Sequence, residues 1–249
     1  MIIPSEQSVQ HRAQMFRLLS AILDDAYLNG LLYFKGGTCA AMRGFLDRFS
    51  VDLNFDYVGE KKEINKVRKK MEEIFEKNNL EIKDKSRNFV QYFLKYPADY
   101  NGRNTLKVDV SFPIIQFNKY ENVELEEIDR IAKCQTVETM FANKLIALIG
   151  RFEKNGSIAG RDVYDVHHFF WRGFRYDEKI IEEAKKCKIE IFFEDILKFV
   201  TDKITQEIID QDINMLLPTK KFQLIRKTLK QETLRMLKNE LARIKNKSL

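Results

Sequence analysis

The sequence predicts an α+β protein in which a mixed sheet flanked by helices is followed by an all-helical bundle. Apolar and polar residues alternate in short segments before residue 113, which is the period of half-buried strands. Beyond residue 136, apolar residues recur every three or four positions, which is the period of helices. We therefore divide the 249 residues into two domains, 1–130 and 131–249.

The first domain opens with a helix that begins at Ser5 and ends at Gly30. A short buried strand is expected at 31–34. Residues 35–38, with the letters KGGT, then turn the chain into a short helix at 39–46.

A strictly alternating segment at 51–57 follows as the next strand. Its apolar face comprises Val51, Leu53, Phe55 and Tyr57, and its polar face comprises Asp52, Asn54 and Asp56. The domain continues with a crossover helix at 61–77 and two strands, at 88–96 and 104–112, joined through 97–103. Asp109 is again a carboxylate on the polar face of a strand.

The second domain is expected to be entirely helical, with the boundary between the domains somewhere in 121–135. Its predicted helices are 136–152, 161–171, 178–200 with a break near Lys188, 202–216 and 220–246.

The amino-acid composition excludes several classes of protein. Apolar residues make up 44% of the chain, which contains only 10 Gly and 4 Pro, so a disordered or collagen-like chain is excluded. No uncharged run approaches the roughly 20 residues that span a bilayer, and the first residues do not resemble a secretory leader. We expect a cytoplasmic protein with no membrane partner. Its three cysteines, an odd number at long spacings, are expected to be reduced thiols.

Positive charge is concentrated at the C-terminus. Residues 219–249 contain ten Lys or Arg and two acids, a net charge of +8, which leaves −2 for the rest of a chain whose net charge is +6. Such a helix is either a solvated surface or a binding site for a polyanion, and the excess favours RNA. The candidate RNA-binding residues are Arg226, Lys227, Lys230, Arg235 and Lys238.

Three features of the first domain point to nucleotidyl transfer. Gly36 and Gly37 let the backbone approach a ligand closely, and the helix that begins behind them presents N–H groups that suit a phosphate. Asp52 and Asp109 lie on the polar faces of two strands, where carboxylates can bind Mg²⁺ beside a triphosphate. Each feature alone has a plain alternative: a structural bend, or acids that face solvent.

Five segments resemble the AbiEii/AbiGii-type toxin family within the DNA polymerase β-like nucleotidyltransferase superfamily, over roughly residues 30–171. They are 33–38 (YFKGGT), 48–55 (RFSVDLNF), 106–112 (LKVDVSF), 143–147 (NKLIA) together with Arg151, and 160–165 (GRDVYD). The resemblance implies a polymerase β-like nucleotidyltransferase lobe. It also implies a toxin that uses Mg²⁺ (or Mn²⁺) to move a nucleotide from an NTP to an RNA acceptor, such as the 3′ end of tRNA, with a protein antitoxin as partner.

The resemblance also implies roles for particular residues. The metal ligands would be Asp52, Asn54 and Asp109, and the phosphates would lie against Gly36, Gly37, Thr38 and Ser50. Lys144 and Arg151 would offset the charge of the phosphates. Asp162 would orient Lys144 or the attacking hydroxyl. Two of these have alternatives from the residues themselves. Lys144 falls within the apolar stripe of its helix, so it either pairs with an anion or extends to solvent. From the residues alone, Asp162 is better explained as the cap of its helix.

One residue departs from the family pattern. Asn54 stands where the family usually has a second Asp, and an amide oxygen brings no charge to a metal. Asp56, two residues further on, is a candidate to compensate. An alternative is therefore a nucleotide-, RNA- or partner-binding protein with weakened catalysis, and another is an enzyme that nucleotidylates a protein. His167 and His168 lack further ligands at metal-binding spacing, so we expect them to pack.

Overall fold

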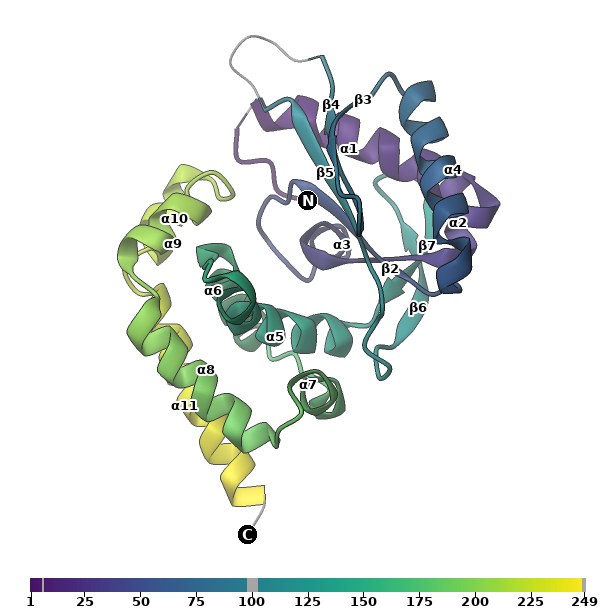
Figure 1. Ribbon diagram of the computed structural model, residues 1–249. Helices are drawn as coiled ribbons and strands as arrows, with labels where there is room; N and C mark the ends of the chain where they lie inside the picture. The colour runs from purple at the N-terminus through teal and green to yellow at the C-terminus, as the bar shows by residue number, and fades with distance from the viewer. Residues whose placement is uncertain (6, 98–102, 248–249) are drawn as a thin grey trace. The chain divides into compact units, whose positions relative to one another are not determined.

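The computed structural model describes residues 1–5, 7–97 and 103–247, and the chain forms two compact units (Figure 1). The first unit comprises Met1–Ile114 and Lys119–Thr136; the second comprises Ile115–Asn118 and Val137–Leu249. The predicted division after residue 130 would cut through a strand that pairs within the first unit, so the observed division lies after Thr136 instead.

One seven-stranded sheet forms the centre of the first unit as far as the structure describes it, in the order β3-β4-β5-β2-β1-β7-β6. Two neighbouring pairs, β2 with β5 and β1 with β7, are parallel, and the others are antiparallel, so the sheet is mixed. The strands are β1 (Leu32–Lys35), β2 (Asp52–Tyr57), β3 (Glu81–Lys85), β4 (Val90–Lys95), β5 (Thr105–Ser111), β6 (Tyr120–Leu125) and β7 (Arg130–Gln135).

Helices cover one face of this sheet. They are α1 (Gln7–Asp24), α2 (Ala26–Leu31) and α4 (Ile64–Lys77), the last preceded by the short turn η1 (Lys61–Glu63). Figure 1 shows α1 and α4 beside each other along the sheet, and their apolar sides, which include Leu19 and Met71, are buried against it. Leu53 and Val108 contribute the buried face of the central strands. The opposite face of β2 and β5 therefore carries the polar residues.

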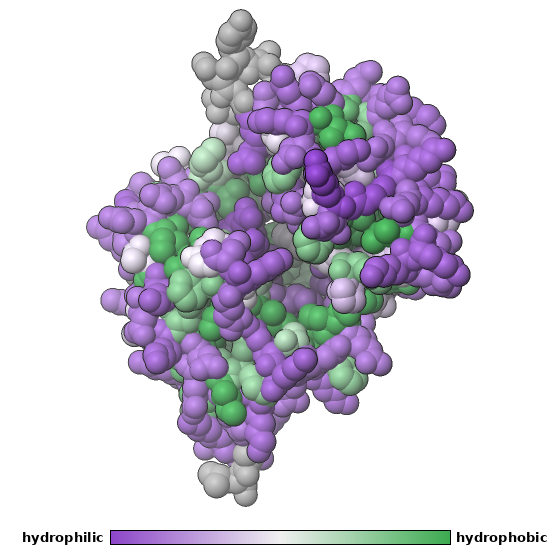
Figure 2. Space-filling view, in the orientation of Figure 1, coloured by the Kyte–Doolittle hydropathy of each residue, from purple (hydrophilic) through white to green (hydrophobic). Residues whose placement is uncertain are grey.

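The second unit is a set of packed helices. They are α5 (Val137–Asn155), α6 (Gly160–Trp171), α7 (Glu178–Lys185), α8 (Ile189–Lys203), α9 (Gln206–Ile213), α10 (Thr219–Ile225) and α11 (Leu229–Lys247). Helix α6 contacts α5, α9 and α11, and nearly all of its residues are buried. Polar side chains dominate the visible surface of the protein, with apolar residues in small groups (Figure 2). Within the described residues, none of the helices combines the length and apolar character that crossing a bilayer requires.

The predicted α+β class is confirmed, and the strands at β1, β2, β4 and β5 lie close to their predicted positions. Strands β3, β6 and β7 were not predicted. Both β3 and β6 are edge strands with mostly charged or polar exposed residues, so their alternation is weak. Most of the predicted connection 97–103 lies outside the described residues.

The long helix predicted at 220–246 is in fact two helices, α10 and α11. The Thr228 N–H donates to the Ile225 carbonyl, which tightens the chain, and the Thr228 carbonyl then accepts from the Glu232 N–H and starts α11. Threonine is a favourable residue at the start of a helix, and this cue competes with the apolar period that predicts one continuous helix.

Helix α3 (Gly36–Met42) begins directly after β1, three residues earlier than predicted, so its first residues, Gly36 and Gly37, form the glycine turn between strand and helix. Gly36 has φ +81°, a conformation that residues with a side chain rarely adopt. A Cβ atom placed on Gly36 would also lie 3.0 Å from the Asn54 amide nitrogen. Glycine is therefore required at this position.

We predict that Gly36→Ala lowers the free energy of unfolding by about 1–2 kcal/mol, because alanine is strained at positive φ. Gly30→Ala is the matched control, since a Cβ there meets nothing within 4 Å and the residue lies in a helix. We expect it to be neutral or stabilising. Urea unfolding of both variants measures the difference, and equal stability of the two would contradict the prediction.

Candidate active site

Buried hydroxyl groups hold the glycine turn in place. The Thr38 hydroxyl donates to the Asp52 carbonyl oxygen at 2.6 Å and lies 2.9 Å from Ser50 Oγ. Both side chains are buried, so Thr38 and Ser50 tie α3 to β2. A Cβ on Gly37 would lie 2.8 Å from Ser50 Oγ and 3.0 Å from the Arg48 guanidinium. The hydroxyl groups of Thr38 and Ser50, two of the predicted phosphate ligands, are thus engaged within the fold.

A row of polar side chains crosses four neighbouring strands beside this turn. Asp109 of β5 pairs in register with Asn54 of β2, which pairs in turn with Lys35 at the end of β1. On the other side, Gln91 of β4 pairs with Asp109. Residues paired in register point to the same face of a sheet, and Asp52 shares that face because it lies two residues from Asn54. The structure thus places Asp52, Asn54 and Asp109 on one face of the neighbouring strands β2 and β5.

Asp109 is held by its own neighbours. One of its carboxylate oxygens lies 2.9 Å from Lys107 Nζ and also accepts from the Gln91 amide at 2.9 Å. The side chains of Asp109 and Lys107 are each a little over a quarter exposed. The carboxylate is therefore partly open to solvent and neutralised by a flexible cation.

Asp56 has a structural role, and the suggestion that it compensates for Asn54 is wrong. Its carboxylate is almost completely buried and lies 2.6 Å from Lys35 Nζ. Its other oxygen accepts from the Tyr120 hydroxyl at 2.8 Å and the Gln135 amide at 2.7 Å. Lys35 also donates to Ser111 Oγ at 2.8 Å. Because these donors already occupy both oxygens, Asp56 is not available to an ion at the surface.

The donor set fits a divalent ion of the magnesium type. Asp52, Asn54 and Asp109 offer hard oxygen ligands on one face of adjacent strands. Over the described parts of the chain, no group of three or more His, Cys, Asp or Glu is arranged to hold a metal. The protein would therefore supply two carboxylates and an amide oxygen, in keeping with the habit of Mg²⁺ of taking its other ligands from water and substrate phosphates.

A buried histidine is hydrogen-bonded to the backbone just before β2. His11 Nε2 lies 2.9 Å from the carbonyl oxygen of Val51, so this nitrogen carries the proton. Its Nδ1 lies 2.7 Å from the Tyr96 hydroxyl, which is also 2.5 Å from the Arg103 carbonyl oxygen. Burial lowers the pKa of His11. The neutral ring thus links α1 to the residue before Asp52, a contact for which the sequence gives no signal beyond a histidine among apolar residues.

The second unit holds the other predicted catalytic residues in two ion pairs. Lys144 Nζ lies 2.6 Å from Asp165, whose side chain is completely buried. Asp162 instead accepts from Arg151 Nε at 2.9 Å. The prediction that Asp162 orients Lys144 is therefore wrong, because Asp165 occupies that position. An acid within the apolar run of α6 needs a cationic partner, and this was the available signal for Asp165.

His167 and His168 are buried, as expected of packing residues. His167 Nε2 lies 2.8 Å from Glu232 of α11. The three cysteines are free thiols, of which Cys39 and Cys134 are buried. Burial raises the pKa of Cys39, which keeps it protonated.

The basic C-terminal residues divide into two groups. Arg226 is paired with Asp210, and Lys230 Nζ donates to the carbonyl oxygens of Thr201 and Ile204 at 2.9 and 2.7 Å. These two hold the helices together, so their prediction as RNA ligands is not supported by their contacts. Lys227, Arg235 and Lys238 are exposed.

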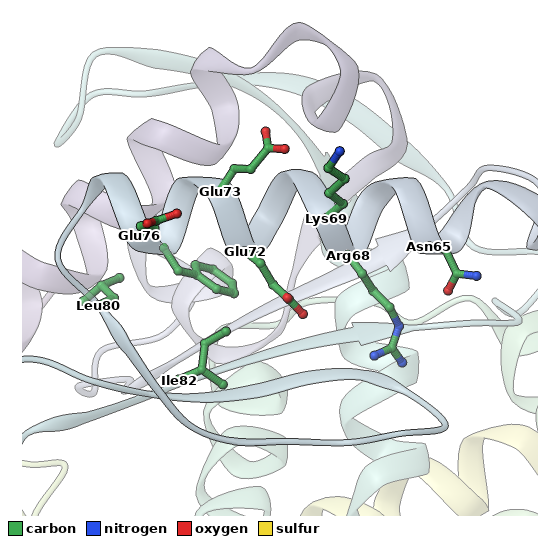
Figure 3. A pocket seen from close by; sticks show the side chains of 9 residues that line it. Asn65, Arg68, Lys69, Glu72, Glu73, Glu76, Leu80 and Ile82 are labelled. Carbon is green, nitrogen blue, oxygen red and sulfur yellow. The ribbon is translucent and has the colours of Figure 1, made fainter.

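A pocket of about 600 Å³ lies elsewhere, between α4 and β3 (Figure 3). Two of its charged residues are engaged within the fold: Arg68 donates to the carbonyl oxygens of Ser86 and Phe89, and Glu72 accepts from Tyr92. None of the predicted site residues lines it. The pocket is not part of the candidate site.

Comparison with known families identifies the chain. The model of the nucleotidyl transferase AbiEii toxin family, of type IV toxin–antitoxin systems, matches residues 17–235. The chain belongs to this family. It is accordingly a nucleotidyltransferase, and the predicted family is confirmed. Comparison with curated protein sequences gives no match.

Solved structures share the fold over nearly the whole chain. JHP933 from Helicobacter pylori is 17% identical with a TM-score of 0.52, and the match covers 98% of this chain and 99% of that one. MenT4, a nucleotidyltransferase toxin from Mycobacterium tuberculosis, is 16% identical with a TM-score of 0.51 and coverages of 95% and 92%. At such identities the likeness concerns the fold alone.

We predict that Asp56→Asn lowers the free energy of unfolding by about 3 kcal/mol, because it breaks a buried ion pair and leaves donors facing an amide. Asp109→Asn is the matched control, and its effect on stability should stay below about 1 kcal/mol, since its ion pair is partly exposed. Chemical denaturation compares the two. Equal losses would show that Asp56 and Asp109 do not differ in role.

We also predict that stability falls as the pH falls below about 6.5. In this range the unfolded chain binds a proton at His11 that the folded chain excludes, because burial lowers the folded-state pKa. His11→Gln should flatten this part of the stability curve. Urea midpoints at several pH values measure the slope, and an unchanged slope in the variant would count against the assignment.

Proposed function

We propose that this family member transfers a nucleotide from an NTP to a hydroxyl group of an RNA acceptor, with the 3′ end of tRNA as the leading candidate. The acceptor oxygen would attack the α-phosphorus, the bond from phosphorus to the bridging oxygen would break, pyrophosphate would leave, and the hydroxyl proton would pass to solvent. The observation that carries the proposal is the register that puts Asp109 beside Asn54, next to the Gly36 turn.

Different residues of the chain would bind the metal ion and the phosphates. Asp52, Asn54 and Asp109 would hold Mg²⁺ or Mn²⁺, which would supply charge neutralisation on the triphosphate. The N–H groups at the start of α3 suit a phosphate, and the buried bonds of Thr38 and Ser50 keep them in position. Lys144 and Arg151 remain proposed phosphate ligands. Their buried partners, Asp165 and Asp162, hold both cations in defined positions.

RNA is favoured as the acceptor by the exposed cations of the last helices. Lys227, Arg235 and Lys238 are exposed, and the segment 219–249 carries a net charge of +8. Phosphate contacts of this kind give affinity that falls with salt. Because the family belongs to toxin–antitoxin systems, we also propose a protein antitoxin as partner.

We predict that incubation with total tRNA, Mg²⁺ and each radiolabelled NTP in turn labels RNA with at least one nucleotide. Asp109→Asn should reduce labelling about 100-fold or more, because a metal ligand is lost. Asp84→Asn, a carboxylate on the exposed edge strand β3, is the matched control and should be fully active. Nucleotide binding by calorimetry without transfer to any RNA would reject the proposed transfer to RNA, and label on protein instead would point to a protein acceptor.

Asn54→Asp separates the proposed enzyme from a catalytically weakened binding protein. If the site works with two carboxylates, the added charge beside Asp109 should change the rate little. A large rise in labelling would mean that Asn54 has weakened catalysis. The same assay with lysate protein in place of RNA tests the remaining alternative.

A further inference from the structure

The only tryptophan of the chain, Trp171, is exposed at the end of α6. Its side chain is 66% exposed, although Trp is among the residues most often buried at least in part. Its ring lies 5.7 Å from the ring of His168, which stacks on Tyr164 at 6.1 Å with an angle of 11° between the planes. His168 and Tyr164 are buried. Trp171 is thus the exposed end of a row of rings whose inner members are fixed.

Positive charge surrounds this row. Lys221 Nζ of α10 lies 5.8 Å from the centre of the Tyr164 ring. Arg172 and Arg175, just after Trp171, are exposed. The segment 166–176 contains no acidic residue.

Three acids of α6 and α11 near this row are engaged in contacts of their own. Asp162 and Asp165 of α6 are buried and paired with Arg151 and Lys144. Glu232 of α11 is bonded to His167. Within 166–176 the exposed charge is therefore cationic, while the exposed acid Glu207 lies on α9, which packs against α6.

We propose that α6 and α10 form a binding surface for single-stranded RNA, with a base stacked on Trp171 and a phosphate at Lys221. Bases stack on exposed aromatic rings whatever their identity, and phosphates pair with cations. Seven residues of helix separate Tyr164 from Trp171, which is about 10 Å along α6, so base and phosphate contacts belong to one short stretch of strand. The surface deepens the proposed function, on which its biological meaning rests, because it would hold the acceptor strand.

Trp171 is its own reporter, since no other tryptophan contributes to the fluorescence. The full-length protein is titrated without NTP with a single-stranded oligouridylate of about 12 nucleotides, a typical site size. We expect saturable quenching of the Trp171 emission. Heparin, a polyanion without bases, should compete with RNA for binding without quenching. Unchanged emission at saturating RNA would overturn the proposal.

Variants are compared by the anisotropy of labelled RNA. Trp171→Ala should weaken binding about tenfold, and Trp171→Phe should retain most of the affinity because a ring remains. Lys221→Gln should weaken binding and reduce the slope of affinity against salt by about one. Ile191→Ala, at another exposed apolar side chain of the second unit, is the matched control and should bind like the parent. Affinity of Trp171→Ala equal to that of the parent would overturn the proposal.

The outcome is distinguishable from that of nucleotidyl transfer. Quenching by RNA without transfer from any NTP would leave the surface standing and reject the proposed reaction. Transfer to RNA with an unchanged KM for RNA in Trp171→Ala would support the proposed reaction and overturn the proposed surface. Because Trp171 is mostly exposed, circular dichroism should confirm that its variants fold normally.

Discussion

The buried ion pair between Lys35 and Asp56 is the constraint on which the candidate site depends. A carboxylate without water is stable only when cations and hydrogen-bond donors surround it, and Asp56 of β2 obtains these from three other strands. Lys35 comes from β1, Tyr120 from β6 and Gln135 from β7, while Lys35 also bonds to Ser111 of β5. One carboxylate therefore fixes the end of β1, and the residue that follows is Gly36.

The same strand thus separates two roles that alternation alone does not distinguish. Asp52, Asn54 and Asp56 share one face of β2, yet Asp56 is buried among side chains from β1, β6 and β7, whereas Asp52 and Asn54 are half-buried. The candidate metal ligands on β2 are thus the two residues that remain partly exposed. Behind them, His11 and Thr38 bond to the backbone of Val51 and Asp52, so the position of the first carboxylate is set from two sides.

The sequence was sufficient to predict those features that depend on the local pattern of apolar and polar residues. The strict alternation of β2 and β5 predicted which residues share a face, and the register confirms that Asp109 lies beside Asn54. It was insufficient where partners come from distant segments. Asp165 is the counter-ion of Lys144 and Asp162 that of Arg151, and nothing local indicates which acid pairs with which cation. Likewise the charge count of the C-terminal segment cannot reveal that Arg226 and Lys230 are engaged within the fold.

The pairing of Lys107 with Asp109 bears on how the protein assembles. A sheet that gathers acids on one face would repel itself during folding unless something countered them, and here an ammonium two residues away in the same strand does so. The folded strand therefore needs no metal ion to offset the charge of Asp109. A cation that came to Asp109 would compete with this ammonium group for the carboxylate.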